Sequence, residues 1–437
     1  MTGLKARGDQ HIEDFLSGRF VPGETGRPVE CSIRTIVIEP DLDGAEAGLV
    51  ERAGLDGRLA VVCDENTIEV MGRRVVRALG DVIEVVLDHP HADEETAADL
   101  RDRIRHADAV VAVGSGTIND LCKHATFPDG RQTAVFGTAA SMNGYVTSTA
   151  SISSGGYKNS LKSKAPAGVF FDLSVLSAAP ARMTCAGVGD SLCRGVAQVD
   201  WLMSHRLLGT PYYNSPYVIQ LDDEPLVLES TGRLLDGDPD AMAALVRLLT
   251  LGGLGVVISG TSHSGSMGEH GISHYIDMFM DPHPGSLHGE QVGVATFSMT
   301  RLQAEMLADE QPPVLEPTRV DEVALRARYG AQADDCIRGL MAKRIDDAAA
   351  ARINGALARD WPGLRDELLA LTLPLARLEA AVGACDGPMK PGDIGLDAAR
   401  YGEAVAHAHE IRDRFSFLDL AAHTGRLAGF AEREAAR

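Results

Sequence analysis

Residues 109–120 read AVVAVGSGTIND, and this stretch decides how the first part of the chain is expected to fold. An apolar run ends at Gly114, and Gly116 opens a segment of helical character. A strand, a glycine turn and a helix in this order are typical of α/β units in which backbone N–H groups at the helix N-terminus bind a diphosphate. The same pattern also fits an ordinary tight turn, so its interpretation depends on the surrounding sequence.

Similar apolar runs lie on both sides of this stretch, separated by amphipathic segments of helical length. They are TIVIEP (35–40), RLAVVCDEN (58–66), DVIEVVLD (81–88), QTAVFGT (132–138) and AGVFFDL (167–173). Apolar strands that alternate with helices predict a parallel sheet that is covered on both faces. After about Leu176 the strand signal fades, and most of the remaining chain has helical character. We therefore expect an α/β protein in which a Rossmann-like sheet domain precedes an all-helical domain.

The length and composition support more than one domain. The chain has 437 residues, of which 45% are hydrophobic and 24% charged, so it can bury a sizeable core. We predict an N-terminal extension over residues 1–30, a nucleotide-binding α/β domain over 31–175, and a helical metal- and substrate-binding domain over 176–437.

The net charge of the chain argues against some classes of binding partner. The chain carries 41 Lys and Arg against 62 Asp and Glu, a net charge of −21, which argues against binding to nucleic acid or to an anionic membrane. An anionic substrate then requires basic groups that are gathered locally. Seven cysteines without CxxC spacing indicate a reducing compartment and argue against a thiolate zinc site. With neither a signal-peptide pattern nor a long uncharged apolar stretch, we expect a cytoplasmic protein without a membrane span.

Polar residues follow two of the predicted strands. Asp64 ends one of them, where an acidic residue binds the ribose hydroxyls of NAD and repels the 2′-phosphate of NADP. The segment TAASMNG (138–144) follows another, and hydroxyl residues at the carboxyl edge of a parallel sheet line the usual ligand crevice. An ordinary solvated carboxylate and an ordinary polar loop remain the alternatives at these positions.

Histidines are concentrated in the second half of the chain. Five lie between residues 263 and 288: His263, His270, His274, His283 and His288. His270 and His274 are four residues apart and share one face of a helix. Two imidazoles and one carboxylate would hold a divalent cation and leave it an open coordination position, and Asp190 is a plausible carboxylate. The alternative is a set of hydrogen-bonded or surface histidines.

A second basic feature is the run Lys158, Lys162 and Lys164. These three lysines could meet a substrate phosphate by charge. The alternative is a solvated basic loop.

The order and spacing of several segments resemble one family. The sn-glycerol-1-phosphate dehydrogenases, with their AraM-type bacterial members, belong to a superfamily with iron-containing alcohol dehydrogenase, glycerol dehydrogenase and 3-dehydroquinate synthase. The resemblance covers roughly residues 31–300 and implies the dehydroquinate synthase-like fold. It rests on GSGTINDLCK (114–123), TAASMNGYVTSTASIS (138–153), FFDLSVLSAAPARMTCAGVGDSLCR (170–194), GSMGEHGISHY (265–275) and SLHGEQVGV (286–294).

The resemblance implies roles for individual residues. The cofactor diphosphate would lie on the turn, Asp120 beside the nicotinamide, and further cofactor contacts would come from three hydroxyl residues. The turn residues are Gly114, Ser115, Gly116 and Thr117, and the hydroxyl residues are Thr138, Ser141 and Thr147. A divalent metal (zinc, nickel or iron) would be bound by Asp190, His270 and His288. His274 would contact the substrate, with Asp190 close to it.

Two departures from the family pattern fall in the expected substrate pocket. Asn143 stands where the family usually has an Asp that contacts substrate, and an amide keeps the hydrogen-bonding shape without the charge. The family stretch S-R-P-A-S-G is replaced by SHSGS over residues 262–266, so an arginine is missing. Both changes leave the exact substrate open.

The expected function is therefore a metal-dependent reduction by NAD(P)H, with NAD favoured. The favoured reaction converts dihydroxyacetone phosphate to sn-glycerol 1-phosphate, with Asp190, His274, Asn143 and Asp120 as catalytic residues. Another ketone or alcohol, a cyclase that recycles its NAD, and a cofactor-binding scaffold without turnover are the alternatives. The expected partner is a small phosphorylated ketone or alcohol, and the family resemblance implies a homo-oligomer.

Overall fold

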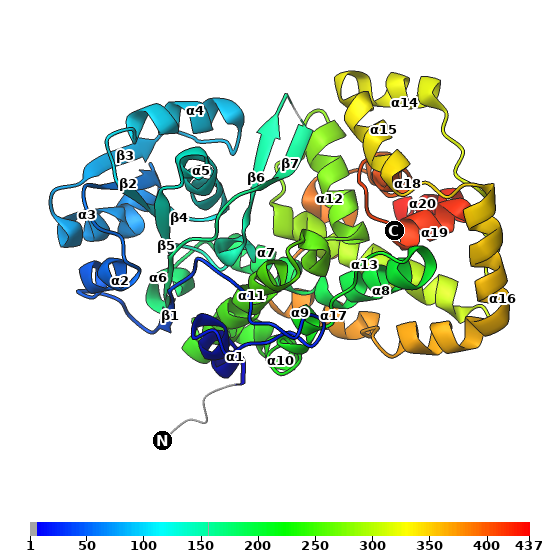
Figure 1. Ribbon diagram of the computed structural model, residues 1–437, viewed down its shortest axis with the longest axis horizontal. Helices are drawn as coiled ribbons and strands as arrows, with labels where there is room; N and C mark the ends of the chain where they lie inside the picture. The colour runs from blue at the N-terminus through cyan, green and yellow to red at the C-terminus, as the bar shows by residue number, and fades with distance from the viewer. Residues whose placement is uncertain (1–6, 156) are drawn as a thin grey trace. The chain divides into compact units, whose positions relative to one another are not determined.

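The structure is a computed structural model that describes residues 7–155 and 157–437 (Figure 1). The chain forms two compact units. The first unit comprises the chain up to Ser191 together with Asn214–Thr261, and the second comprises Leu192–Tyr213 and Ser262–Arg437.

The first unit contains a six-stranded sheet with the order β1-β8-β5-β4-β2-β3, and every pairing in it is parallel. Strands β4, β5 and β8 are almost entirely buried, as continuous apolar strands predict. All six predicted strands are confirmed. Their bounds are β1 Thr35–Glu39, β2 Leu59–Asp64, β3 Ile83–Leu87, β4 Ala109–Gly114, β5 Gln132–Gly137 and β8 Gly168–Asp172.

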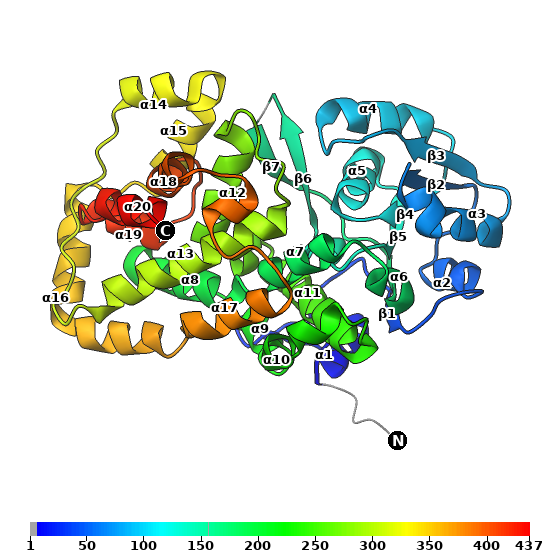
Figure 2. The ribbon, with the colours of Figure 1, turned by 180° about the vertical axis from the view of Figure 1, so that it is seen from behind.

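Helices cover this sheet and close its core. The apolar cluster of this core includes Val61, Val111, Phe136 and Phe170, which are fully buried. Helix α5 contacts β2, β4 and β5, and Figure 2 shows it beside these strands. The connecting elements are α2 Glu46–Arg52, η1 Ile68–Gly72, α3 Arg73–Leu79, α4 Glu94–Arg103, α5 Gly116–Thr126, η2 Phe127–Asp129, η3 Gly144–Val146 and α6 Leu173–Ser177.

A two-stranded antiparallel sheet follows the fifth strand of the large sheet, and the apolar-run pattern did not predict it. It pairs β6 Thr149–Ser154 with β7 Tyr157–Lys162. Its sequence is rich in Ser and Lys rather than apolar, so it lacks the signal that identified the other strands. Lys158 and Lys162 lie on β7, and Lys164 follows it.

The contact-defined units differ from the predicted domain division at residue 175. Four helices after that point belong to the first unit: α7 Ala181–Ser191, α9 Ser215–Val218, α10 Glu224–Leu234 and α11 Pro239–Ser259. Helix α11 packs against β1, α6 and α7 and is apolar on nearly all sides. Its mean hydropathy of 2.1 would allow it to cross a bilayer, but 83% of the apolar window is buried, as in a core helix.

Part of the predicted N-terminal extension is folded. Helix α1 Arg7–Leu16 packs on α11, where the Nη1 atom of Arg247 lies 3.7 Å from the Oδ1 atom of Asp9. Glu24 accepts hydrogen bonds from the backbone N–H groups of Asn214 (2.6 Å) and Ser215 (2.9 Å). Residues 7–30 therefore belong to the first unit. Residues 1–6 of the predicted extension lie outside the described residues.

The second unit is helical, and every strand that the structure describes lies in the first unit. Helices α12 and α13 pack against each other, and Tyr275 and Phe297 on them are fully buried. The elements are α8 Arg194–Leu208, η4 Ser262–Gly265, α12 Gly268–Phe279, α13 His288–Ala308, α14 Glu322–Tyr329, η5 Gly330–Gln332, α15 Ala333–Ala342, α16 Asp347–Leu369, α17 Leu375–Ala384, η6 Pro391–Ile394, α18 Ala398–His407, η7 Ala408–Glu410, α19 Phe417–His423 and α20 Leu427–Ala435. The predicted fold class is thereby confirmed, with the difference in boundary given above.

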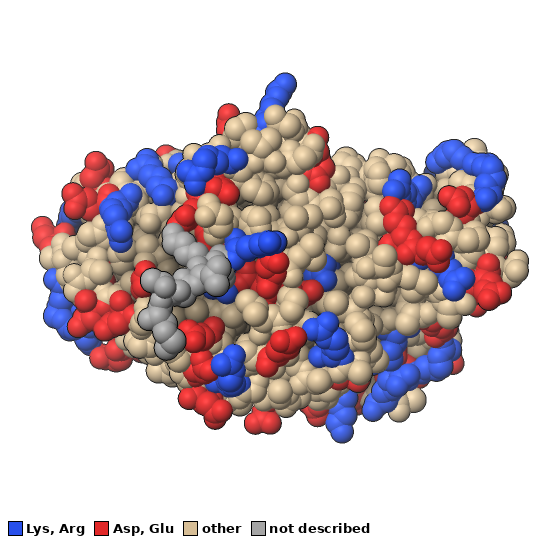
Figure 3. Space-filling view, turned by 90° about the horizontal axis from the view of Figure 1, so that it is seen from below, with Lys and Arg blue, Asp and Glu red and all other residues tan. Residues whose placement is uncertain are grey.

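Charged side chains are mixed on the surface. On the face drawn in Figure 3, Lys and Arg are scattered among Asp and Glu rather than gathered in one continuous basic patch. All seven cysteines are free thiols, and six of them are buried. The six buried thiols therefore act as small residues of the core.

Candidate active site

The glycine turn has the structure that the sequence predicts. Gly114 ends β4, Ser115 has extended backbone angles, and α5 begins at Gly116. A Cβ atom at Gly114 would lie 2.7 Å from the Cβ atom of Ile118, so a side chain at this position does not fit. Ser115, Gly116 and Thr117 are half-buried, and the first backbone N–H groups of α5 have no partner within the helix.

Asp64 lies beside this turn, because β2 pairs directly with β4. Its Oδ1 atom accepts hydrogen bonds from the backbone N–H groups of Asn66 (3.0 Å) and Thr67 (2.7 Å). The hydroxyl of Thr67 in turn donates to the carbonyl of Val113 at 2.9 Å. Asp64 therefore holds the end of β2 next to the glycine turn.

Asp120 and Thr147 meet at a buried lysine that the sequence analysis did not single out. The Nζ atom of Lys123 lies 2.9 Å from the Oδ1 atom of Asp120 and donates to the carbonyls of Gly144 (3.0 Å) and Thr149 (2.5 Å). The hydroxyl of Thr147 lies 3.3 Å from the same nitrogen. Lys123 thus ties α5 to the segment that follows Asn143. Its spacing of three residues from Asp120 was the only signal available in the sequence.

The segment after β5 is held closely by two helices of the same unit. The backbone N–H of Thr138 donates to the carbonyl of Gly114 at 3.1 Å, which joins this segment to the glycine turn. A Cβ atom at Gly187 of α7 would lie only 1.7 Å from the carbonyl oxygen of Ala140. Only glycine permits this approach of α7 to the segment.

Asn143 and Asp190 are joined by this packing. The backbone N–H of Asn143 donates to the Oδ2 atom of Asp190 at 2.9 Å. A Cβ atom at Gly253 of α11 would lie 2.3 Å from the carbonyl oxygen of Asn143, so α11 closes on the same segment from its own side. Ser141 and Asn143 are half-buried, and Asp190 is buried at 2% exposure.

Three of the five clustered histidines come together in the second unit. His270 and His274 lie one turn apart on α12, and His288 is the first residue of α13. Their ring centroids are 5.0 Å apart for His270 and His288, 6.1 Å for His274 and His288, and 6.2 Å for His270 and His274. His263 and His283 lie elsewhere: His263 contacts the ring of Trp201, and His283 pairs with Asp277.

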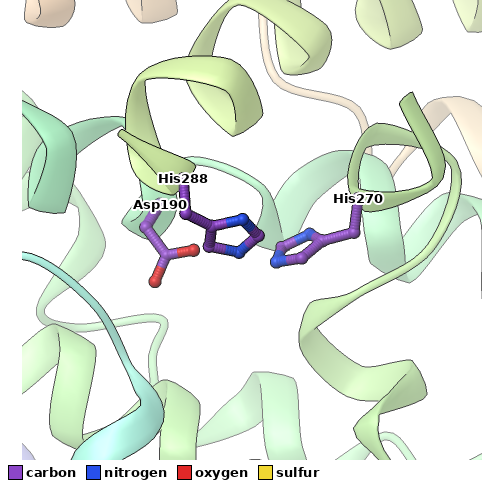
Figure 4. Close-up of side chains that lie close together, drawn as sticks. All are labelled: Asp190, His270 and His288. Carbon is purple, nitrogen blue, oxygen red and sulfur yellow. The ribbon is translucent and has the colours of Figure 1, made fainter. Parts of the chain in front are cut away.

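The predicted metal ligands lie close to one another. Asp190 lies near the end of α7. One ligand atom each from Asp190, His270 and His288 lie within 4.8 Å of one another (Figure 4). One carboxylate oxygen and two imidazole nitrogens are ligands that fit zinc, nickel or iron, and three protein ligands leave a catalytic cation an open position.

Hydrogen bonds behind the two rings orient them. The Nδ1 atom of His270 lies 2.9 Å from the Oε1 atom of Glu269, which is fully buried. The Nδ1 atom of His288 lies 3.0 Å from the hydroxyl of Ser273, and that hydroxyl donates to the Oε1 atom of Gln291 at 2.7 Å. Ser273 therefore accepts a hydrogen bond from His288. A proton on each Nδ1 leaves each Nε2 with the lone pair that a cation requires.

The charge of Glu269 acts on a second buried carboxyl group, that of Asp200. Burial acts to raise the pKa of Glu269, but the hydrogen bond and charge of His270 lower it below its ordinary value. Burial and the charge of Glu269 together raise the pKa of Asp200 well above its ordinary value. The one signal for Glu269 in the sequence is its position directly before His270.

Comparisons with known proteins identify the family to which the chain belongs. The sequence model of the family described as iron-containing alcohol dehydrogenase matches residues 37–180. A protein of Halalkalibacterium halodurans, glycerol-1-phosphate dehydrogenase [NAD(P)+], is 31% identical over 378 residues, which cover 82% of this chain and 85% of the relative. The protein of the same name from Thermococcus kodakarensis is 30% identical over 299 residues and covers 67% and 85% of the two chains.

Solved structures of the same superfamily share the fold. An iron-containing alcohol dehydrogenase from Corynebacterium glutamicum superposes with a TM-score of 0.60 at 15% identity, covering 92% of this chain and 98% of the other. A probable glycerol dehydrogenase from Sinorhizobium meliloti gives 0.59 at 17% identity, with 91% and 97% coverage. The resemblance inferred from the sequence is confirmed. The chain belongs to the glycerol-1-phosphate dehydrogenase [NAD(P)+] family of oxidoreductases, within the iron-containing alcohol dehydrogenases.

Proposed function

We propose that the chain reduces dihydroxyacetone phosphate to sn-glycerol 1-phosphate with NAD(P)H as the hydride donor and one divalent cation. The observation that carries this proposal is the group formed by Asp190, His270 and His288, whose ligand atoms lie within 4.8 Å of one another in a chain of this family. The names of its relatives supply the substrate and the cofactor pair. The substrate is a small phosphorylated ketone.

The residues around the group have distinct tasks in this reaction. When bound, a divalent cation supplies Lewis acidity and the nicotinamide supplies the hydride. Glu269 and Ser273 hold the rings of His270 and His288 in the tautomer that ligates. His274, one helical turn from His270, delivers the proton that the substrate oxygen needs after reduction. Asn143 orients a substrate hydroxyl by hydrogen bonding without contributing charge.

The cofactor would lie along the carboxyl edge of the sheet. Gly114, Ser115, Gly116 and Thr117 offer backbone N–H groups to the diphosphate, and Asp64 would take the ribose hydroxyls, which favours NAD. Asp120, Thr138, Ser141 and Thr147 complete the proposed cofactor contacts. We also propose that the protein is a cytoplasmic homo-oligomer. Residues 31–175 would bind the cofactor, and residues 176–437 would bind the substrate.

The test combines turnover with metal content. Purified protein loaded in turn with zinc, nickel or iron is assayed with NADH and NADPH against dihydroxyacetone phosphate, dihydroxyacetone and other keto phosphates. His270→Ala is expected to lose both bound metal and turnover while its circular dichroism spectrum stays that of the wild type. His283→Ala, which removes a histidine outside the group, should retain both.

The outcomes separate the alternatives. A metal-loaded and active His270→Ala protein would overturn the assignment. Turnover with another ketone but not with dihydroxyacetone phosphate would support the reduction by NAD(P)H but show that the proposed substrate is wrong. Asn143 and His263, which stand where the family has other residues, would explain such a change in substrate. Conversion of substrate without net consumption of NADH would identify a cyclase, and bound metal without any turnover would identify a scaffold.

A further inference from the structure

Two arginines from the end of the chain contact the segment that lacks the family arginine. The segment is Ser262–Gly265 (η4) and Ser266, just before α12. Arg412 donates from Nη1 to the hydroxyl of Ser266 at 2.9 Å. Arg414 donates from Nη2 to the hydroxyl of Ser262 at 2.6 Å, and from Nη1 to the carbonyl of Ser266. These two guanidinium groups therefore stand beside position 263, where the family sequence has an arginine and this chain has His263.

The electrostatic effect of the two arginines is visible at His263. Burial is the first cause that lowers the pKa of this imidazole, and the charges of Arg414 and Arg412 lower it further, to about 2. The imidazole is neutral at physiological pH because it is buried and because a proton there would also meet two positive charges. In a chain of net charge −21, this is a local concentration of positive charge of the kind that an anionic substrate requires.

A buried hydroxyl in the same turn lacks a partner. Ser264 is 3% exposed, and among the described residues its Oγ atom has no hydrogen-bond partner. Buried polar side chains are almost always hydrogen-bonded in native proteins. The Ser264 hydroxyl is a buried donor in the turn that Arg412 and Arg414 contact, so it is suited to donate a hydrogen bond to an anionic oxygen of a ligand.

The segment lies close to the histidine group within the same unit. The thiol of Cys193 lies 3.7 Å from the carbonyl oxygen of Gly265, and it also lies within 4.8 Å of a ligand atom of His270. Ser266 precedes His270 by only four residues. The turn is therefore near enough to serve the same small substrate as His270.

We propose that Arg412 and Arg414, with the hydroxyls of Ser264 and Ser266, form the subsite for the phosphate group of the substrate. The two arginines, which come from the C-terminal part of the chain, supply the positive charge that the family arginine would provide at position 263. Guanidinium groups bind phosphate oxygens through paired, charge-assisted hydrogen bonds, which suits this role better than an imidazole held neutral. This inference rests on the proposed reduction of a phosphorylated ketone.

The test compares a phosphorylated with an unphosphorylated substrate. In Arg412→Ala, kcat/KM for dihydroxyacetone phosphate should fall about 10- to 100-fold, as expected for the loss of one hydrogen bond to a charged group. The kcat/KM for dihydroxyacetone and the metal content should stay at the wild-type level. Arg412→Lys keeps the charge and should recover part of the loss. Arg433→Ala removes a surface arginine of the same unit, which pairs with Glu305, and should change neither substrate.

A binding measurement separates this inference from the proposed function. Inorganic phosphate is titrated into metal-loaded wild type and Arg412→Ala by calorimetry, which needs no turnover. Weaker phosphate binding in the variant supports the subsite even if the wild type fails to reduce dihydroxyacetone phosphate. Equal phosphate binding in both proteins, or an equal loss of activity on both substrates, would overturn the subsite while leaving the reduction itself intact.

Discussion

Lys123 offers a direct test of how the first unit holds the segment around Asn143. Its side chain is 1% exposed, and the side chain of Asp120, its ionic partner at 2.9 Å, is 12% exposed. Lys123→Met keeps the length of the side chain and removes the charge. The carboxylate of Asp120 then stays buried with only the N–H groups of Asn119 (3.0 Å) and Ser151 (2.9 Å) to satisfy it.

The expected cost follows from this geometry. Removing one partner of a buried ion pair costs about 3–5 kcal/mol, because the remaining charge is left uncompensated. In a unit of this size each kcal/mol lowers the melting temperature by about 2–4 °C, so the shift should be roughly 6–20 °C. Asp120→Asn in the same chain removes the stranded charge while an amide oxygen still accepts a hydrogen bond. The double variant should therefore be more stable than Lys123→Met alone.

Thermal unfolding and urea unfolding, both followed by circular dichroism, are measured for the wild type, both single variants and the double variant; heat gives the melting temperature and urea the free energy of unfolding. Lys164→Met, which removes an exposed lysine of the same unit, is the matched control and should change stability by less than about 0.5 kcal/mol. A coupling of about 1–3 kcal/mol between positions 120 and 123 is expected. If Lys123→Met matches the control, or if the two single effects simply add, the reasoning from burial fails.

Two further predictions concern carboxyl groups of the second unit. Glu269→Gln should weaken metal binding about 10- to 100-fold in a chelator competition, because the acceptor that orients His270 loses its charge. Glu432→Gln, which changes an exposed carboxyl group, is the control. Equal metal affinities of the two variants would refute the orienting role of Glu269. Burial acts to raise the pKa of Glu410, but hydrogen bonds from His407 and Tyr329 and the charge of His409 lower it to about 2. Because this carboxyl group has a folded pKa below its ordinary 4.5, its contribution of about 3 kcal/mol is present above pH 4.5 and is lost as the pH falls toward 2. Glu410→Gln should therefore be less stable than the wild type at neutral pH, and the difference should shrink in acid unfolding measured across that range; a constant difference would contradict it.

The sequence by itself determined the features that depend on local pattern. Apolar runs identified the six parallel strands because buried strands have a continuous apolar signature. The turn at Gly114 could be placed at a strand end because it directly follows an apolar run. His270 and His274 could be placed on one helix face because residues four apart in a helix are neighbours. The serine- and lysine-rich hairpin over 149–162 has no such signature, so it appears only in the structure.

The tertiary structure decided which distant side chains meet. Lys123 reaches the carbonyl of Thr149, and Arg412 reaches Ser266 across 146 residues of chain. It likewise decided that α11 packs with the sheet, although its sequence reads only as an apolar helix. Periodicity reports which face of an element is buried, but it carries no information about the partner that covers that face. The partner is selected by packing and by the satisfaction of buried charges over the whole chain.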